Sequence, residues 1–102
     1  MLVLPHVLRF NLSVAHALYA ELAEVAVPAC KGSTEARATA FILYLEGLAE
    51  ATGMVTTLRQ VGVKVTDLPR LAQNAMLQTR LLANNPRELA ERDALAIYQA
   101  AF

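Results

Sequence analysis

The sequence predicts an all-α protein, a helical bundle of about five helices folded as a single domain over residues 1–102. Long segments rich in Ala, Leu and Glu repeat their apolar residues with the helical period. Short stretches of Gly, Pro and Asn separate these segments, and no segment alternates between apolar and polar residues as a half-buried strand does. A chain of 102 residues is long enough for one hydrophobic core.

The first apolar segment occupies residues 1–11 and has no polar residues leading into it. The residues after Asn11 predict a turn, with Ser13 as the N-cap of a second helix that runs to about Val27. Pro28 ends that helix. An apolar stripe is expected along one side of it, formed by Ala17, Leu18, Glu21, Leu22 and Val25.

The longest predicted helix begins at Ser33 or Thr34, has Glu35 near its positive end, and runs to Thr52. Gly53 stands in the C-terminal stop position. Apolar residues recur along this helix at helical spacing, namely Phe41, Ile42, Leu45, Leu48 and Ala49. Because Leu43 and Tyr44 add apolar side chains on its flanks, the helix is expected at the centre of the bundle.

Two further helices are expected in the C-terminal third. Thr66 and Asp67 precede a Leu-Pro pair and predict a helix start, since Pro is tolerated in a first turn. This helix should end near Gln78. Residues 84–86, Asn-Asn-Pro, predict a stiff loop, and a last helix should run from about Glu91 to the C-terminus.

Composition argues against several classes of partner. Nine basic and nine acidic residues give a formal net charge of zero, so the chain has no field with which to gather nucleic acid or an anionic membrane surface. No uninterrupted apolar stretch is long enough for a membrane span, and the N-terminus lacks the features of a signal peptide. The single Cys30 fits a reducing, cytoplasmic location and is interpreted as packing.

The apolar content is high for a small domain, at 56% of residues, with a mean hydropathy of +0.38. We expect more apolar surface than one small core can cover, and therefore a partner surface. Leu2, Val3, Leu4, Val7 and Leu8 are expected to be exposed and to drive self-association into a homo-oligomer, a two-fold dimer being the simplest form.

The sequence shows no active site. His6 and His16 are ten positions apart on different predicted helices, without acidic residues at metal-ligand spacing. No glycine-rich phosphate loop is present, so no cofactor or metal is expected to bind to this chain alone. Ser13 and Ser33 are interpreted as helix caps. The acidic residues of the helices are interpreted as solvated faces, namely Glu46, Glu50, Glu88, Glu91 and Asp93.

Three stretches nevertheless carry a resemblance: LVLPHVLRFN at residues 2–11, LRQVGVKVTDLPRLAQNA at 58–75 and LLANNPRELAERDALAIYQAAF at 81–102. Together they closely resemble the C-terminal helical half of iron-containing (group III) alcohol dehydrogenases, part of the dehydroquinate synthase-like fold. The resemblance implies a partner domain that binds NAD or NADP, and a metal, Fe or Zn, held by one Asp and three His. In the family the last of these His lies a few residues before the segment that resembles residues 2–5.

The resemblance also bears on single residues. His6 corresponds to a family histidine that is not a metal ligand, so it is interpreted as a packing, hydrogen-bonded residue. Leu81 lies in the loop that approaches the substrate side of the cleft and is the candidate pocket-lining residue, with core packing as the alternative. The sequence departs from the family at Val55, Thr79 and Ala90, which replace a usual Pro, Asp and Thr or Ser N-cap.

Two functional hypotheses follow. In the first, the chain is a truncated C-terminal domain of an NAD(P)- and metal-dependent alcohol dehydrogenase-like protein, inactive alone, whose partner is the missing nucleotide-binding half. In the second, the same helical domain is a stand-alone interaction or oligomerisation module.

Overall fold

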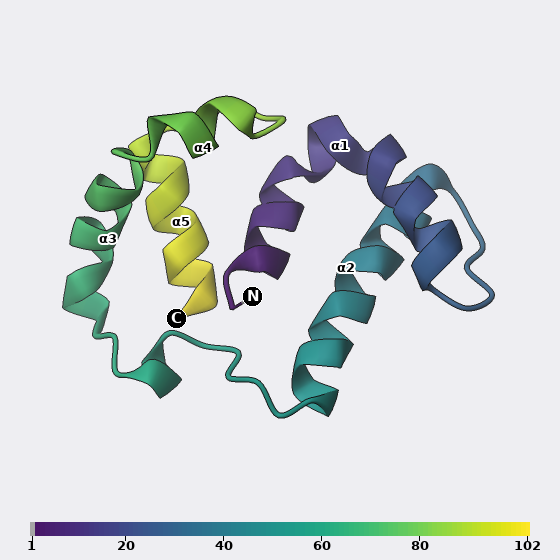
Figure 1. Ribbon diagram of the computed structural model, residues 1–102, viewed down its shortest axis with the longest axis horizontal. Helices are drawn as coiled ribbons and strands as arrows, with labels where there is room; N and C mark the ends of the chain where they lie inside the picture. The colour runs from purple at the N-terminus through teal and green to yellow at the C-terminus, as the bar shows by residue number, and fades with distance from the viewer. Residues whose placement is uncertain (1) are drawn as a thin grey trace.

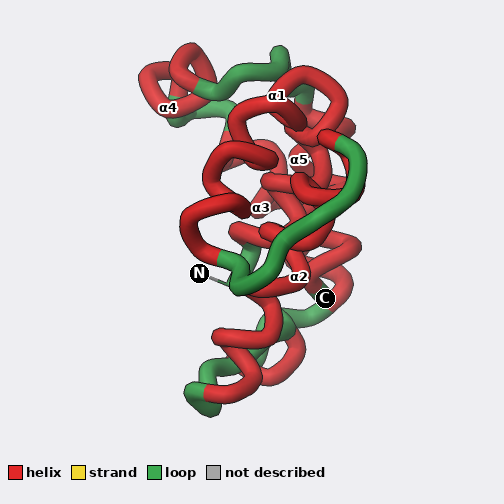
Figure 2. The backbone as a smooth tube through the Cα atoms, turned by 90° about the vertical axis from the view of Figure 1, so that its right-hand side faces the viewer, coloured by secondary structure: helices red, strands yellow, loops and turns green. Residues whose placement is uncertain are grey.

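Residues 2–102 are described by a computed structural model, in which they form helices and loops without a strand (Figures 1 and 2). The elements follow in the order α1 (Leu4–Ala26), α2 (Thr34–Ala51), α3 (Leu68–Ala75), α4 (Thr79–Asn84) and α5 (Glu91–Ala101), with two short 3₁₀ turns, Arg59–Val61 and Val65–Asp67, between α2 and α3. The predicted all-α class and the number of α-helices are confirmed for these residues.

The predicted break near Asn11 is wrong. The hydrogen-bonded helix α1 runs without interruption through Asn11 and Ser13 to Ala26, so Ser13 is an exposed residue within a helix and not an N-cap. Figure 1 shows instead that the axis of α1 changes direction in its middle. The first helix therefore has two arms, one beside α5 and one beside α2.

The ends of α2 are as predicted. Ser33 has the extended backbone of an N-cap, and its hydroxyl accepts a hydrogen bond of 3.1 Å from the Ala36 amide. After Ala51 the chain leaves the helix through Thr52, and Gly53 adopts the left-handed φ of 72° that favours glycine at this position.

The fourth predicted helix, expected to end near Gln78, is shorter than predicted, and a further helix follows it. Helix α3 ends at Ala75, and a separate helix α4 spans Thr79–Asn84, a segment in which no helix was predicted. The loop expected at residues 84–86 starts one residue later, at Asn85, and α5 begins at Glu91 as predicted.

Two small cores hold these helices together. In one, between α1 and α2, Ala15, Tyr19 and Ala38 are buried, with Phe41 packed against them. In the other, Leu58, Leu68 and Ala101 bring α3, α5 and the loop after α2 together. In Figure 1 the α1–α2 pair lies on the right and α3, α4 and α5 lie on the left.

The cores are made mainly of small side chains, and Ile42 is the largest that is fully buried. The molecule measures 42 × 31 × 18 Å, so its shortest dimension is less than two helix diameters of about 10–12 Å each. Its accessible surface of 6592 Å² exceeds the roughly 5,700 Å² expected for a folded chain of this mass. Each helix therefore covers one face and leaves much of the other exposed.

The predicted apolar stripe of α1 does lie on one side of the helix, and that side faces the solvent. Leu18, Leu22 and Val25 are 61%, 50% and 90% exposed, whereas Ala15 and Ala23 face the core. A correction applies to the segment expected to be exposed at the N-terminus. Leu2, Val3, Val7 and Leu8 are half-buried, and in this segment only Leu4, at 37%, is exposed.

Candidate functional site

His6 lies where α1, α2 and α5 meet, beside an ion pair. The Arg9 guanidinium, one turn further along α1, donates two hydrogen bonds to the two carboxylate oxygens of Glu46 on α2, the Nη2–Oε2 bond being 2.9 Å long. Such a two-point contact holds the planar groups in a fixed orientation. Glu46, interpreted from the sequence as part of a solvated face, instead joins α2 to α1.

The electrostatics favour a neutral His6 and an ionised Glu46. Burial lowers the pKa of His6, the positive charge of Arg9 lowers it further, and the carboxylate of Glu46 opposes both effects. The hydrogen bonds from Arg9 lower the pKa of Glu46. The imidazole makes no hydrogen bond with the described residues, so the expected hydrogen-bonded role of His6 is not found in residues 2–102.

Two hollows flank His6. One, of about 290 Å³, is lined by His6, Glu46, Glu50, Thr56 and Thr57 together with apolar residues of α1, α2 and α5. The other, of about 300 Å³, lies between α1 and α5 and is bordered by His6, Arg9 and Asp93. The first could hold a small polar molecule beside the imidazole.

This site does not fit the family's metal or its nicotinamide nucleotide. Among residues 2–102 no three His, Cys, Asp or Glu side chains are placed so that they could hold a metal ion together. The hollow carries the carboxylates of Glu46 and Glu50, which would repel the phosphates of a nucleotide, and glycine is not among the residues that line it.

A second cluster joins α1 to the loop after α4. Asn11 is 3% exposed, and its side-chain amide exchanges two hydrogen bonds of 2.8 Å with that of Asn85. Asn85 also donates to the Arg87 carbonyl at 2.6 Å. Arg87 in turn donates to the Phe10 carbonyl at 2.8 Å, and its guanidinium lies 4.1 Å from the centre of the Phe10 ring. These hydrogen bonds join the R-F-N motif at residues 9–11 to the N-P-R motif at residues 85–87.

A third cluster links the first 3₁₀ turn to the C-terminus. The Leu58 amide donates a hydrogen bond of 2.8 Å to the Ala101 carbonyl, and the Arg59 guanidinium lies 4.5 Å from the centre of the Phe102 ring. This contact pairs the L-R-x-x-G-V motif with the terminal A-A-F. In both clusters the residues that carry the resemblance fasten distant segments together.

Leu81, the site residue predicted from the sequence, belongs neither to the site beside His6 nor to the two other clusters. It is on α4, is 66% exposed, and lines none of the hollows beside His6. The alternative that it packs in the core of residues 2–102 is wrong. Its expected role beside a substrate pocket stays a prediction.

The three departures from the family lie at different places. Val55 borders the hollow beside His6, and Thr79 is the first residue of α4. Ala90 is the N-cap of α5 and has no side chain with which to cap it. Asp93 compensates in part, because its carboxylate accepts a 2.9 Å hydrogen bond from the Ala90 amide.

Sequence analysis missed the Arg9–Glu46 pair and the Asn11–Asn85 pair. The partners are 37 and 74 positions apart, so no local pattern joins them. One available signal was Arg9 itself, a charged side chain in the middle of an apolar segment, which needs a partner or water.

The whole chain, residues 1–102, matches the model of the Fe-containing alcohol dehydrogenase family, C-terminal. It is 33% identical over 102 residues to lactaldehyde reductase of Escherichia coli (strain K12), covering 99% of this chain and 26% of that protein. It is 34% identical over 100 residues to 1,3-propanediol dehydrogenase of Klebsiella pneumoniae, covering 97% and 26%.

A solved structure supports the same relationship. The crystal structure of 1,3-propanediol oxidoreductase aligns with a TM-score of 0.92 at 34% identity, over 99% of this chain and 26% of that one. The chain therefore spans about a quarter of the length of the relatives it matches. None of the helices in residues 2–102 is both long and apolar enough to cross a membrane.

Proposed function

Because the chain belongs to the Fe-containing alcohol dehydrogenase family and corresponds to its C-terminal domain, we propose that residues 1–102 serve as the helical C-terminal part of an alcohol dehydrogenase-type oxidoreductase and do not transfer hydride by themselves. The observation that carries this proposal is the coverage: the match extends over nearly all of this chain but over only 26% of each relative.

The role proposed for the domain is to form one side of a site that it does not complete. The family resemblance implies NAD(P) and Fe or Zn, which supply the hydride acceptor and the polarisation of the alcohol oxygen. The donor set of residues 2–102 does not fit that metal, so both groups would be held by a nucleotide-binding partner. By analogy with the names of the relatives, the substrates would be small diols or hydroxyaldehydes.

Leu81 is the residue proposed to face the substrate in such an assembly. Its side chain is 66% exposed on the short helix α4, so it is free to contact another domain. The neighbouring Asn11–Asn85 pair fixes the loop that follows α4, which would set the position of Leu81.

The second candidate function, a stand-alone interaction or oligomerisation module, is favoured by a different observation. Leu18, Leu22 and Val25 present apolar side chains to solvent along α1. Such a module would need neither a nucleotide nor a metal.

The experiment assays the 102-residue protein alone with 1,3-propanediol and NAD⁺ or NADP⁺, and with lactaldehyde and NADH or NADPH, each with Fe²⁺ or Zn²⁺. The Klebsiella pneumoniae dehydrogenase provides the matched positive control. We expect no nicotinamide turnover above the blank. Metal-dependent turnover that stays with the protein through a second purification would overturn the proposal.

A further inference from the structure

A small hollow, called here the apolar hollow, lies between the arm of α1 beside α5, helix α4 and helix α5. Its volume is about 120 Å³, and α1 and α5, which flank it, lie side by side (Figure 1). All the residues that line it are buried or half-buried, so its walls are the packed sides of helices and not an exposed face. They are Val3, Val7, Ala75, Leu82, Leu89, Ala94, Ile97 and Tyr98.

The chemistry of these walls decides which ligands the apolar hollow can take. Tyr98 is the one lining residue whose side chain carries a polar atom, and none of the lining side chains is charged. An ion or a strongly polar molecule would lose its water there without gaining the hydrogen bonds that replace it. Apolar cavities, by contrast, stay dry and bind apolar molecules, as a cavity of about 150 Å³ binds benzene. The apolar hollow therefore suits hydrocarbon.

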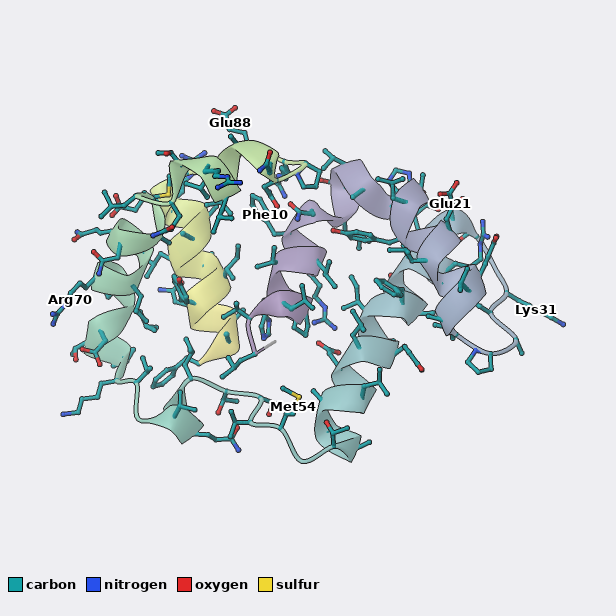
Figure 3. The ribbon with its side chains drawn as sticks, viewed as in Figure 1. Phe10, Glu21, Lys31, Met54, Arg70 and Glu88 are labelled. Atoms are coloured by element: carbon teal, nitrogen blue, oxygen red, sulfur yellow. The ribbon has the colours of Figure 1, made fainter. Side chains whose placement is uncertain are left out.

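The segment from α4 to α5 forms one wall of the apolar hollow and is held in place. Leu81 is 66% exposed, whereas the next residue, Leu82, is half-buried and lines the hollow. In the loop after α4, Glu88 points away from the protein in Figure 3, and the next residue, Leu89, lines the hollow. The two hydrogen bonds between the side-chain amides of Asn11 and Asn85 tie this loop to α1. The hollow is therefore formed before any ligand enters it.

We propose that the apolar hollow binds an unbranched hydrocarbon chain of about four carbons, carried by a molecule whose uncharged polar end stays in water. The volume supports this occupant, because a methylene group is about as large as a water molecule, which takes roughly 30 Å³. The hollow is also open to solvent at part of its boundary, so the chain can enter while the polar end stays outside. This site goes beyond the dehydrogenase role, because it needs neither a nucleotide nor a metal.

The length of the chain sets the expected affinity. Each methylene that leaves water for the apolar hollow should tighten binding about three- to fourfold. Beyond about four carbons the hollow is full, so further methylenes stay in water and add little. Nonspecific apolar association has no such limit, since it strengthens with every methylene added. A limit on chain length therefore distinguishes binding in the hollow from association with the surface.

The test is a titration of the 102-residue protein with N-alkylacetamides from N-ethylacetamide to N-octylacetamide, followed by the methyl NMR signals of Val7, Leu82 and Ile97. These probes are uncharged and contain no alcohol group, so the measurement is independent of turnover and of the dehydrogenase role. We expect millimolar dissociation constants that fall about three- to fourfold per carbon up to the butyl compound and then level off.

Two substitutions change the size of the apolar hollow in opposite directions. Ala75→Leu fills it and should weaken binding of N-butylacetamide at least about tenfold. Leu82→Ala enlarges it and should move the limit to longer chains. Ala83→Leu is the matched control for Ala75→Leu, because Ala83 is exposed on α4 and does not line the hollow. Circular dichroism shows whether each variant is folded.

Binding that tightens with every carbon up to the octyl compound would overturn the proposal. So would the absence of shifts at the three methyl-bearing residues, or equal effects of Ala75→Leu and Ala83→Leu. If Ala75→Leu does not fold, Leu82→Ala decides the question, because an unchanged limit on chain length in the folded variant contradicts the proposal.

Discussion

Asn11 and Asn85 lie 74 positions apart in the chain and face each other with both side-chain amides, each donating to the other at 2.8 Å. These two hydrogen bonds join the middle of α1 to the loop that precedes α5. Because Asn11 is 3% exposed, loss of Asn85 leaves a buried amide without its hydrogen-bond partner, whereas loss of Asn11 leaves the half-buried Asn85 with its hydrogen bond to the Arg87 carbonyl.

We expect Asn11→Ala and Asn85→Ala each to lower the free energy of unfolding by about 1–3 kcal/mol. The double variant should cost less than the sum of the two, with a coupling of about 0.5–3 kcal/mol in a double-mutant cycle. Urea unfolding measures all three values. Asn84→Ala, an exposed neighbour at the end of α4, is the control and should change stability by no more than about 0.5 kcal/mol. Strictly additive effects would show that the two amides do not support each other.

The His6 cluster predicts loss of stability in acid. The pKa of His6 is lowered in the folded protein from an ordinary value of 6.5. Between that value and the lowered one, the unfolded chain binds more protons than the folded chain, so the free energy of unfolding falls as the pH falls. The pKa of Glu46 is also lowered from its ordinary value of 4.5, and this gives a second decrease at lower pH.

Thermal unfolding across this pH range measures the effect. His6→Gln should remove the decrease that begins near neutral pH and leave the one due to Glu46, whereas Glu46→Gln should do the reverse. His16→Gln serves as the matched control. A pH profile unchanged by His6→Gln would contradict the assignment.

The two helix caps predict effects of opposite sign. Ser33→Ala removes the hydroxyl that caps α2 and should cost about 1 kcal/mol. Ala90→Ser supplies a hydroxyl at the uncapped start of α5, where Asp93 already accepts from the Ala90 amide, and should gain up to about 1 kcal/mol. The change in stability of each variant is measured from the midpoint of its urea unfolding curve. A destabilising Ala90→Ser would mean that α5 does not begin where the structure places it.

Leu81 and Leu68 test the difference between a surface and a core leucine. Leu81 is 66% and Leu68 is 2% exposed. We expect Leu81→Ala to change the free energy of unfolding by less than about 0.5 kcal/mol and Leu68→Ala to lower it by about 2–5 kcal/mol. Calorimetry compares the two. A large cost at Leu81 would contradict its place on the surface.

Local signals predicted those parts of the fold that local chemistry decides. The Ser33 cap, the Gly53 stop and the start of α5 follow from residues within a few positions of each helix end. The family could also be predicted, because its motifs are contiguous stretches of sequence, and the match over residues 1–102 confirms it.

The parts of the fold that the sequence did not predict depend on contacts between residues far apart in the sequence. The polar Asn11 was interpreted as a turn, but Asn85 satisfies its amide and the helix continues. The apolar stripe of α1 was expected on one side of the helix without a statement of what it contacts, and the small side chains of Ala15, Ala23 and Ala38 form the buried face where α1 meets α2. Helix α4 is six residues long and lacks a side-chain cap, so no local signal marked it.

The most direct test of the proposed role is to replace the C-terminal quarter of the Klebsiella pneumoniae 1,3-propanediol dehydrogenase with residues 1–102 and to measure oxidation of 1,3-propanediol by the chimera. The same dehydrogenase without its C-terminal quarter, and the 102-residue protein alone, are the controls. The account predicts turnover by the chimera and none by either control. A folded, metal-loaded chimera without activity, or turnover by the 102-residue protein alone, would contradict it.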